Sequence, residues 1–147
     1  ECSCAFTGNP RGRERASSLS SSLSSSAIEL VSIVDDDPFV RAATSSLVRS
    51  FGWEARAFES AVDFLASDVP ARTRCLVCDI QMPAMDGIAL VERLEREGLR
   101  PPVIFISAFA NARTRERVQA SAALCLIEKP IDAAELEAWI GRALSRD

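Results

Sequence analysis

Residues 75–90 of the chain are CLVCDIQMPAMDGIAL, and this stretch contains a strand, a loop and the start of a helix. Residues 74–78 end in four consecutive apolar side chains, so both faces of the predicted strand are apolar, as in a parallel sheet that helices cover on both sides. The loop over residues 79–87 contains Met82-Pro83 and Asp86-Gly87, and residues 88–97 form the predicted helix. A buried strand that is followed, after a loop, by a helix indicates an α/β fold.

The same succession of a short apolar run and a helical segment occurs on both sides of this stretch. In residues 133–144, for example, apolar side chains recur at spacings of three and four, which is the pattern of an amphipathic helix. We predict strands at residues 30–34, 53–58, 74–78, 103–106 and 124–127, and helices at residues 38–51, 60–67, 88–97, 113–122 and 133–144. Five such units with right-handed crossovers predict a flavodoxin-like (βα)5 three-layer sandwich with a parallel five-stranded sheet of order 2-1-3-4-5.

The first 27 residues differ from the rest of the chain in composition. Residues 17–26 are serine except for Leu19 and Leu23, and such low-complexity sequence buries too little apolar surface to offset its ordering entropy. We predict a flexible tail, linker or added segment at residues 1–27 and one folded domain at residues 28–147. We expect residues 1–27 not to act as a secretory signal, because they have no continuous apolar region, and no apolar run of the 147 residues reaches the roughly 18 residues of a membrane span.

The composition excludes several kinds of chemistry and of partner. The 147 residues contain no histidine, which excludes Ser-His-Asp and Cys-His catalysis and histidine-ligated zinc. Cys75 and Cys78 have C-x-x-C spacing, but residues three apart in a strand point to opposite faces, so we interpret both as buried apolar side chains. Unpaired thiols suit a reducing cytoplasm. A net charge of −4 without a basic cluster argues against direct binding of nucleic acid.

Charged and polar residues follow the predicted strands at one end. Residues 35–37, all aspartates, follow the first strand, and Asp79, Ser107 and Lys129 follow the third, fourth and fifth. Taken singly, an aspartate before a helix is usually an N-cap and a serine after a strand is usually a turn residue. In the order 2-1-3-4-5, however, the first and third strands are neighbours, and ligands of open α/β sheets bind beyond the carboxyl ends of the strands. The shared position therefore predicts a single site.

The predicted cluster of carboxylates requires a counter-charge. Two carboxylates about 4 Å apart repel each other by about 4 kcal/mol at an effective dielectric constant of 20. A set of oxygen ligands with no soft donor is typical of Mg²⁺ or Mn²⁺, and Mg²⁺ commonly binds together with phosphate. Asp79 would then attack phosphorus and form an acyl phosphate, while Lys129 and Ser107 contact the phosphoryl oxygens.

Five stretches occur in the order and spacing of a known family: VSIVDDDPFVR (31–41), FGWEARAFES (51–60), CLVCDIQMPAMDGIAL (75–90), PVIFISAFAN (102–111) and LIEKP (126–130). Residues 29–144 resemble a bacterial response-regulator receiver domain of two-component systems, in particular a receiver of the FixJ type. The resemblance implies a signalling domain that a histidine kinase or histidine phosphotransfer protein phosphorylates in a Mg²⁺-dependent reaction. It also implies signalling through altered dimer or domain contacts, with a homodimer on phosphorylation, and no enzymatic action on external substrates.

The resemblance implies a role for each matching residue of the site. It identifies Asp79 as the phosphoacceptor, and Ser107 and Lys129 as the residues that contact the phosphoryl group. The residues implied to bind the metal ion are Asp36, Asp79, Asp35 through a water molecule, and Gln81 through its main-chain carbonyl. The residues implied to shape the site or its switch are Ala108, Leu126, Pro83, Gly87 and Pro130.

Three positions need a comment within this resemblance. The Lys129–Pro130 bond is expected to be cis, and Asp37 is expected to be peripheral to the site. Leu126 stands where receivers usually have Tyr or Phe, and the chain has no tyrosine. The common coupling between the hydroxyl residue and the rotamer of that aromatic side chain is therefore in doubt here, although phosphorylation is not.

Other interpretations remain open at this point. A receiver-like interaction module that works without phosphorylation would keep the fold but leave the acidic set unexplained. A haloacid-dehalogenase-like phosphatase would use Asp35 as its nucleophile, but would not explain the loop after Asp79. A flavin-binding module would need a hydroxyl- and glycine-rich phosphate loop after the first strand, where this chain has three aspartates. Receivers of the FixJ type precede a C-terminal helix-turn-helix DNA-binding output domain, so we expect one beyond residue 147, with a stand-alone receiver as the alternative.

Overall fold

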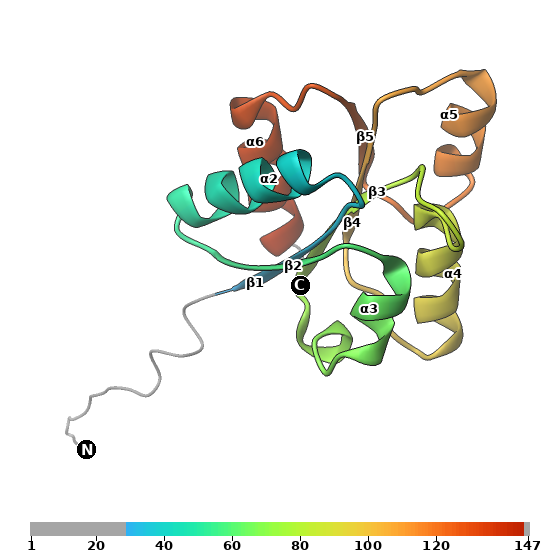
Figure 1. The fold of residues 1–147 in the computed structure, drawn as a ribbon, viewed down its shortest axis with the longest axis horizontal. Coiled ribbons are helices and arrows are strands. Elements are labelled where there is room, and N and C mark those ends of the chain that lie inside the picture. Colours follow the sequence, from blue (N-terminus) through green and yellow to red (C-terminus); the bar gives the residue numbers. More distant parts are fainter. Residues whose placement is uncertain (1–28, 146–147) are drawn as a thin grey trace, which may run out of the picture.

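A computed structural model describes residues 29–145, so the flexible segment predicted at residues 1–27 lies outside the described part. The strands are β1 (Leu30–Val34), β2 (Glu54–Phe58), β3 (Cys75–Asp79), β4 (Val103–Ser107) and β5 (Cys125–Glu128). All neighbouring strands are parallel, and their order in the sheet is β2-β1-β3-β4-β5 (Figure 1). The predicted fold class and strand order are therefore confirmed.

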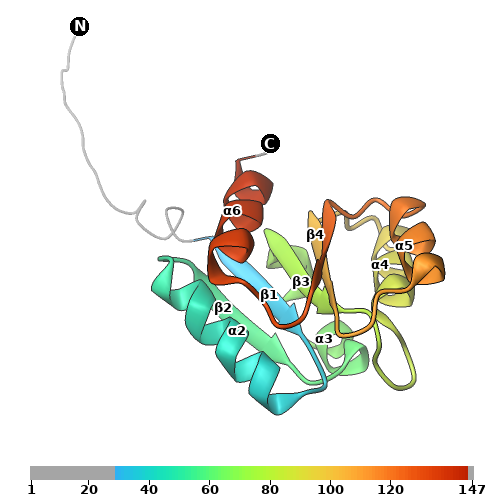
Figure 2. The same cartoon turned by 90° about the horizontal axis from the view of Figure 1, so that it is seen from above.

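Helices cover both faces of this sheet. They are α2 (Pro38–Ser50), α3 (Ala61–Ala66), α4 (Gly87–Arg96), α5 (Ala112–Gln119), α6 (Ala133–Leu144) and the short 3-10 helix η2 (Pro70–Arg72). Figure 2 shows α2 and α6 on one face and α3, α4 and α5 on the other. Most bounds lie within one residue of those predicted, but α5 ends three residues early and η2 was not predicted. None of the helices within residues 29–145 combines the length and the apolar character that crossing a bilayer requires.

Two hydrophobic cores, one on each face of the sheet, bury the strands. Cys78 belongs to the core under α3, α4 and α5, whereas Cys75 belongs to the core under α2 and α6. Burial raises the pKa of the Cys75 thiol to about 12 and that of Cys78 well above its usual value. The two sulfurs therefore form no redox or metal pair, and their prediction as buried apolar side chains is confirmed.

The helices begin and end where local chemistry dictates. Each of the five α-helices begins after a side chain that accepts a hydrogen bond from a free backbone N–H of the first turn. These capping residues are Asp37, Ser60, Asp86, Asn111 and Asp132. Gly52 and Gly98, just beyond the ends of α2 and α4, have φ of 100° and 82°, a left-handed conformation that glycine adopts without strain.

The strand register places the predicted site residues at one edge. Val34 of β1 lies beside Cys78 of β3, so Asp35 follows β1 next to Asp79. On the other side of β3, Asp79 lies beside Ile106, the residue before Ser107. The carboxyl ends of β1, β3, β4 and β5 therefore meet, which is the edge where parallel α/β sheets bind ligands.

Candidate functional site

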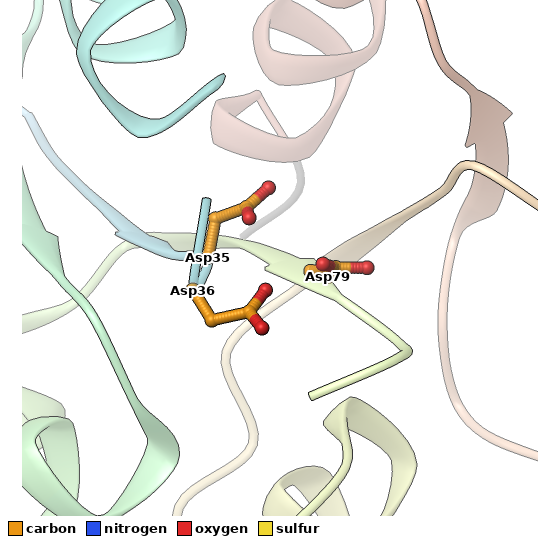
Figure 3. Close-up of side chains that lie close together, drawn as sticks. All are labelled: Asp35, Asp36 and Asp79. Carbon is orange, nitrogen blue, oxygen red and sulfur yellow. The ribbon is translucent and has the colours of Figure 1, made fainter. Parts of the chain in front are cut away.

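Three aspartates meet at the carboxyl ends of β1 and β3. Each of Asp35, Asp36 and Asp79 offers one carboxylate oxygen, and these three oxygens lie within 4.8 Å of one another. Figure 3 shows Asp35 and Asp36 leaving the end of β1 beside Asp79 at the end of β3. Asp35 and Asp79 are buried, with 0% and 3% of their surface exposed, whereas Asp36 is exposed. The structure thus brings together the side chains that were predicted to share a site.

Lys129 supplies the positive charge of this cluster. Its Nζ lies 3.2 Å from Asp35 Oδ2 and 3.3 Å from Asp79 Oδ2. Burial alone would lower the pKa of this ammonium, but the nearby carboxylates of Asp79 and Asp35 outweigh burial and raise the pKa above its usual value. Three carboxylates and one ammonium sum to −3 + 1 = −2 when all are ionised, so the cluster keeps an excess of negative charge.

The negative charge is costly at Asp79. Burial, followed by repulsion from Asp35, raises the pKa of Asp79 to about 6, although Lys129 acts in the opposite direction. A cation brought between the carboxylates would relieve this cost. Asp35 Oδ2 is also buried without a hydrogen bond of good geometry, although it lies 3.2 Å from the ammonium of Lys129. An all-oxygen cluster with excess charge fits a hard divalent cation such as Mg²⁺.

The three consecutive aspartates have different surroundings. Asp37 Oδ1 accepts hydrogen bonds from the backbone N–H groups of Phe39 and Val40, at 2.9 and 3.4 Å, and so caps α2. Ordinary capping therefore explains Asp37, in agreement with its predicted peripheral position. Asp35 Oδ1 accepts from the backbone N–H of Asp37 at 2.8 Å. Asp35 thus has one oxygen bonded within its own loop and the other beside Lys129, the same kinds of contact that hold Asp79.

Ser107 is buried at the end of β4 and makes two hydrogen bonds. Its hydroxyl is 2.7 Å from Gln81 Oε1, to which it donates, and it accepts from the backbone N–H of Phe109 at 3.1 Å. The backbone N–H of Gln81 in turn donates to Asp79 Oδ1 at 3.2 Å. Only the main chain of Gln81 was expected to take part in the site, and no sequence pattern marks its side chain as a partner of Ser107.

The loop after β3 approaches the sheet closely at Gly87, the first residue of α4. A Cβ atom on Gly87 would lie 2.5 Å from the main-chain oxygen of Asp79, so no side chain fits there without a shift of the backbone. The N–H of Gly87 also donates to the carbonyl of Ile80 at 3.0 Å. Gly87 therefore lets the loop that contains Pro83 turn back directly behind the site.

The remaining predicted residues surround the site without joining the acidic cluster. The Lys129–Pro130 peptide bond is cis, as expected. Leu126 is half-buried and packs against the core under α3, α4 and α5. Ala108 is exposed directly after Ser107. Their effects on switching stay predictions.

Two ion pairs attach α5 to its neighbours, and neither was predicted from the sequence. Arg115 Nη2 lies 2.6 Å from Glu128 Oε2 at the end of β5. Arg117 Nη2 lies 3.1 Å from Asp86 Oδ2, and Asp86 is also the residue that caps α4. Both pairs are close to half-exposed, and Glu128 directly precedes Lys129 of the site.

Comparisons with known proteins agree with this geometry. Residues 31–141 match the family described as the response regulator receiver domain. The transcriptional regulatory protein TdiR of Thauera aromatica is 32% identical over 78% of this chain and 51% of its own length, and FixJ of Azorhizobium caulinodans is 30% identical over 79% and 55%. The crystal structure of FixJ-N superposes with a TM-score of 0.73 at 28% identity, over 81% of this chain and 95% of that one. The chain spans about half the length of these two curated relatives.

Proposed function

The chain belongs to the response regulator receiver domain family, and from this premise we propose that it accepts a phosphoryl group on Asp79 and relays a signal. The observation that supports the proposal best is the meeting of Asp79 with Asp35, Asp36 and Lys129 at one edge of the sheet. Two buried carboxylates beside each other repel, which lowers the stability of the fold. A purely structural role therefore does not explain this arrangement.

A hard divalent cation, Mg²⁺ or Mn²⁺, would be held at this edge. Its proposed ligands are Asp36, Asp79, Asp35 through a water molecule, and the main-chain carbonyl of Gln81. When bound, such an ion supplies positive charge against the phosphoryl oxygens and against the carboxylates themselves. The excess negative charge and the burial of Asp35 Oδ2, which has an ion pair with Lys129 but no hydrogen bond, support this assignment.

In the proposed reaction, a carboxylate oxygen of Asp79 forms a bond to phosphorus as the bond between phosphorus and the donor breaks. A pKa of about 6 leaves Asp79 mostly ionised at pH 7, and therefore able to act as the nucleophile. Lys129, already beside Asp79 Oδ2, would stay with the transferred group and pair with one of its oxygens. Ser107 would donate a hydrogen bond to another oxygen, and Ala108 would leave space beside it.

The 147 residues contain no histidine that could carry a phosphoryl group on imidazole, so the donor group lies outside these residues. We propose a histidine kinase or a histidine phosphotransfer protein as the partner, in the cytoplasm. The relatives TdiR and FixJ are transcriptional regulatory proteins about twice as long as the matched region. This supports a DNA-binding output domain as the recipient of the signal. We propose that the signal reaches it through altered contacts between the two chains of a dimer.

The proposal is tested by incubating the chain with acetyl phosphate and Mg²⁺ and measuring its intact mass. The wild type should gain one phosphoryl group, and should gain none when EDTA removes the metal. Asp79→Asn should gain none, whereas Asp37→Asn, which changes a capping aspartate of the same loop region, should be phosphorylated normally. A chain that gains no mass, or an Asp79→Asn variant that still does, would contradict the proposal and favour an interaction module that works without phosphorylation.

A further inference from the structure

The hydroxyl of Ser107 is already occupied in this structure. It lies 2.7 Å from Gln81 Oε1, and it accepts a hydrogen bond from the backbone N–H of Phe109 at 3.1 Å. A hydroxyl has a single proton to donate. Because the backbone N–H of Phe109 can only donate, the hydroxyl proton of Ser107 is donated to Gln81, and it is not available to an oxygen of a phosphoryl group on Asp79.

The orientation of the Gln81 amide is fixed from its other side. Gln81 Nε2 donates to the carbonyl oxygen of Phe109 at 3.4 Å, and a carbonyl oxygen can only accept. The nitrogen of the amide therefore faces Phe109, and its oxygen faces Ser107. Gln81 thus joins the loop after β3 to the loop after β4, while its own backbone N–H donates to Asp79 Oδ1.

We propose that Gln81 is a positioning residue that restrains Ser107 in the unphosphorylated chain. This inference rests on the proposed function, since it concerns how Ser107 comes to contact a phosphoryl group on Asp79. In the resting chain, Gln81 Oε1 accepts the proton of Ser107. In the phosphorylated chain, a phosphoryl oxygen accepts it, so one hydrogen bond is exchanged for another.

This exchange gives Gln81 an opposing effect on activation. Each phosphorylation event must break the bond between Ser107 and Gln81, and an ordinary neutral hydrogen bond of this kind changes an equilibrium by about two- to tenfold. Gln81 Nε2 also donates to the carbonyl of Phe109, so the side chain that holds the Ser107 hydroxyl also contacts the loop that leads into α5.

Beryllium fluoride is a tetrahedral mimic of the phosphoryl group on an aspartate. The test measures the equilibrium affinity of the chain for beryllium fluoride in the presence of Mg²⁺. Gln81→Met keeps the length of the side chain but removes the amide, and leaves the main-chain carbonyl in place. It should bind beryllium fluoride about two- to tenfold more tightly than the wild type. Gln119→Met, the same change at an exposed position on α5, should bind as the wild type does.

The Ser107→Ala background separates this role from a merely structural one. If Gln81 acts through the hydroxyl of Ser107, Gln81→Met should have no effect on affinity once Ser107→Ala has removed that hydroxyl. Unchanged or weaker binding by Gln81→Met, or the same gain in both backgrounds, would overturn the inference while leaving phosphorylation of Asp79 intact. A wild-type chain that neither binds beryllium fluoride nor gains mass with acetyl phosphate would overturn the proposed function and the inference together.

Discussion

Helices α5 and α6 cover opposite faces of the same sheet, but different interactions hold them there (Figure 2). Helix α6 buries Leu136, Ile140 and Ala143 against the sheet, whereas α5 buries only Val118. Helix α5 depends instead on the exposed ion pairs of Arg115 and Arg117. Helix α6 is thus fixed by apolar burial, whereas α5 is attached through charges that lie next to the site.

The free energies behind these two attachments differ widely. Truncation of a large buried apolar side chain costs about 2–5 kcal/mol, whereas an exposed ion pair contributes about 0–1 kcal/mol. A rearrangement at the site can therefore displace α5 at little cost, while α6 stays in place. Because Glu128 adjoins Lys129 and Asp86 begins α4, both partners of α5 are connected to segments that form the site.

The largest expected effect tests the anchored helix. Ile140→Ala should lower the free energy of unfolding by about 2–5 kcal/mol, because Ile140 is fully buried and its loss leaves a cavity. Val118→Ala, which removes the one buried side chain of α5, should cost about 1 kcal/mol. Urea unfolding of both variants measures the difference. Equal losses would show that α5 is anchored as firmly as α6.

The second largest effect concerns the negative charge of Asp79, at the end of the strand β3. Asp79→Asn should raise the free energy of unfolding by about 1–3 kcal/mol at pH 7 without divalent cations, because the raised pKa of Asp79 means that its ionised form destabilises the fold. The folded chain binds this proton more tightly than the unfolded chain does. The penalty is therefore absent below about pH 4 and appears in full as the pH rises above about 6.

Urea unfolding of the wild type and Asp79→Asn at about pH 4 and about pH 7.5 measures this dependence. The gain from the substitution should be present at the higher pH and should disappear at the lower one. An Asp79→Asn variant that is less stable than the wild type at about pH 7.5 would place the electrostatic cost elsewhere than in Asp79.

The smallest expected effect refines the description of α5. Arg117→Gln removes the ion pair with Asp86 but keeps most of the side-chain length, and it should change the free energy of unfolding by less than about 1 kcal/mol. The same substitution should nevertheless speed amide hydrogen exchange in α5, because few other contacts hold that helix. A loss of several kcal/mol would mean that this pair is a main support of the fold.

The sequence predicted the sheet and the acidic edge because both depend on patterns within short segments. Apolar runs located the strands, and polar residues directly after those runs located Asp79 and Lys129 at a common edge. The contacts of side chains between loops were not predictable in this way. Gln81 and Ser107 are 26 residues apart, and Asp86 and Arg117 are 31 apart, so only the folded positions of their backbones bring them together.

The aspartates at residues 35–37 show the same limit on a smaller scale. Three identical side chains in succession have no sequence feature that separates their roles. The backbone separates them, because Asp37 points at the free N–H groups of α2 while Asp35 faces Lys129. A helix cap and a residue of the charged site thus occur within three residues, and the backbone conformation determines which aspartate has which role.

We predict that α5, and not α6, responds to a phosphoryl group on Asp79, because α6 buries three side chains against the sheet and α5 buries one. Amide hydrogen exchange measured with and without beryllium fluoride and Mg²⁺ tests this claim most directly. We predict exchange rates altered by about fivefold or more in residues 108–119, no change in residues 133–144, and no change in either segment of Asp79→Asn. Equal changes in both helices, or an unaltered α5 in a chain that binds beryllium fluoride, would contradict the prediction that α5 alone responds.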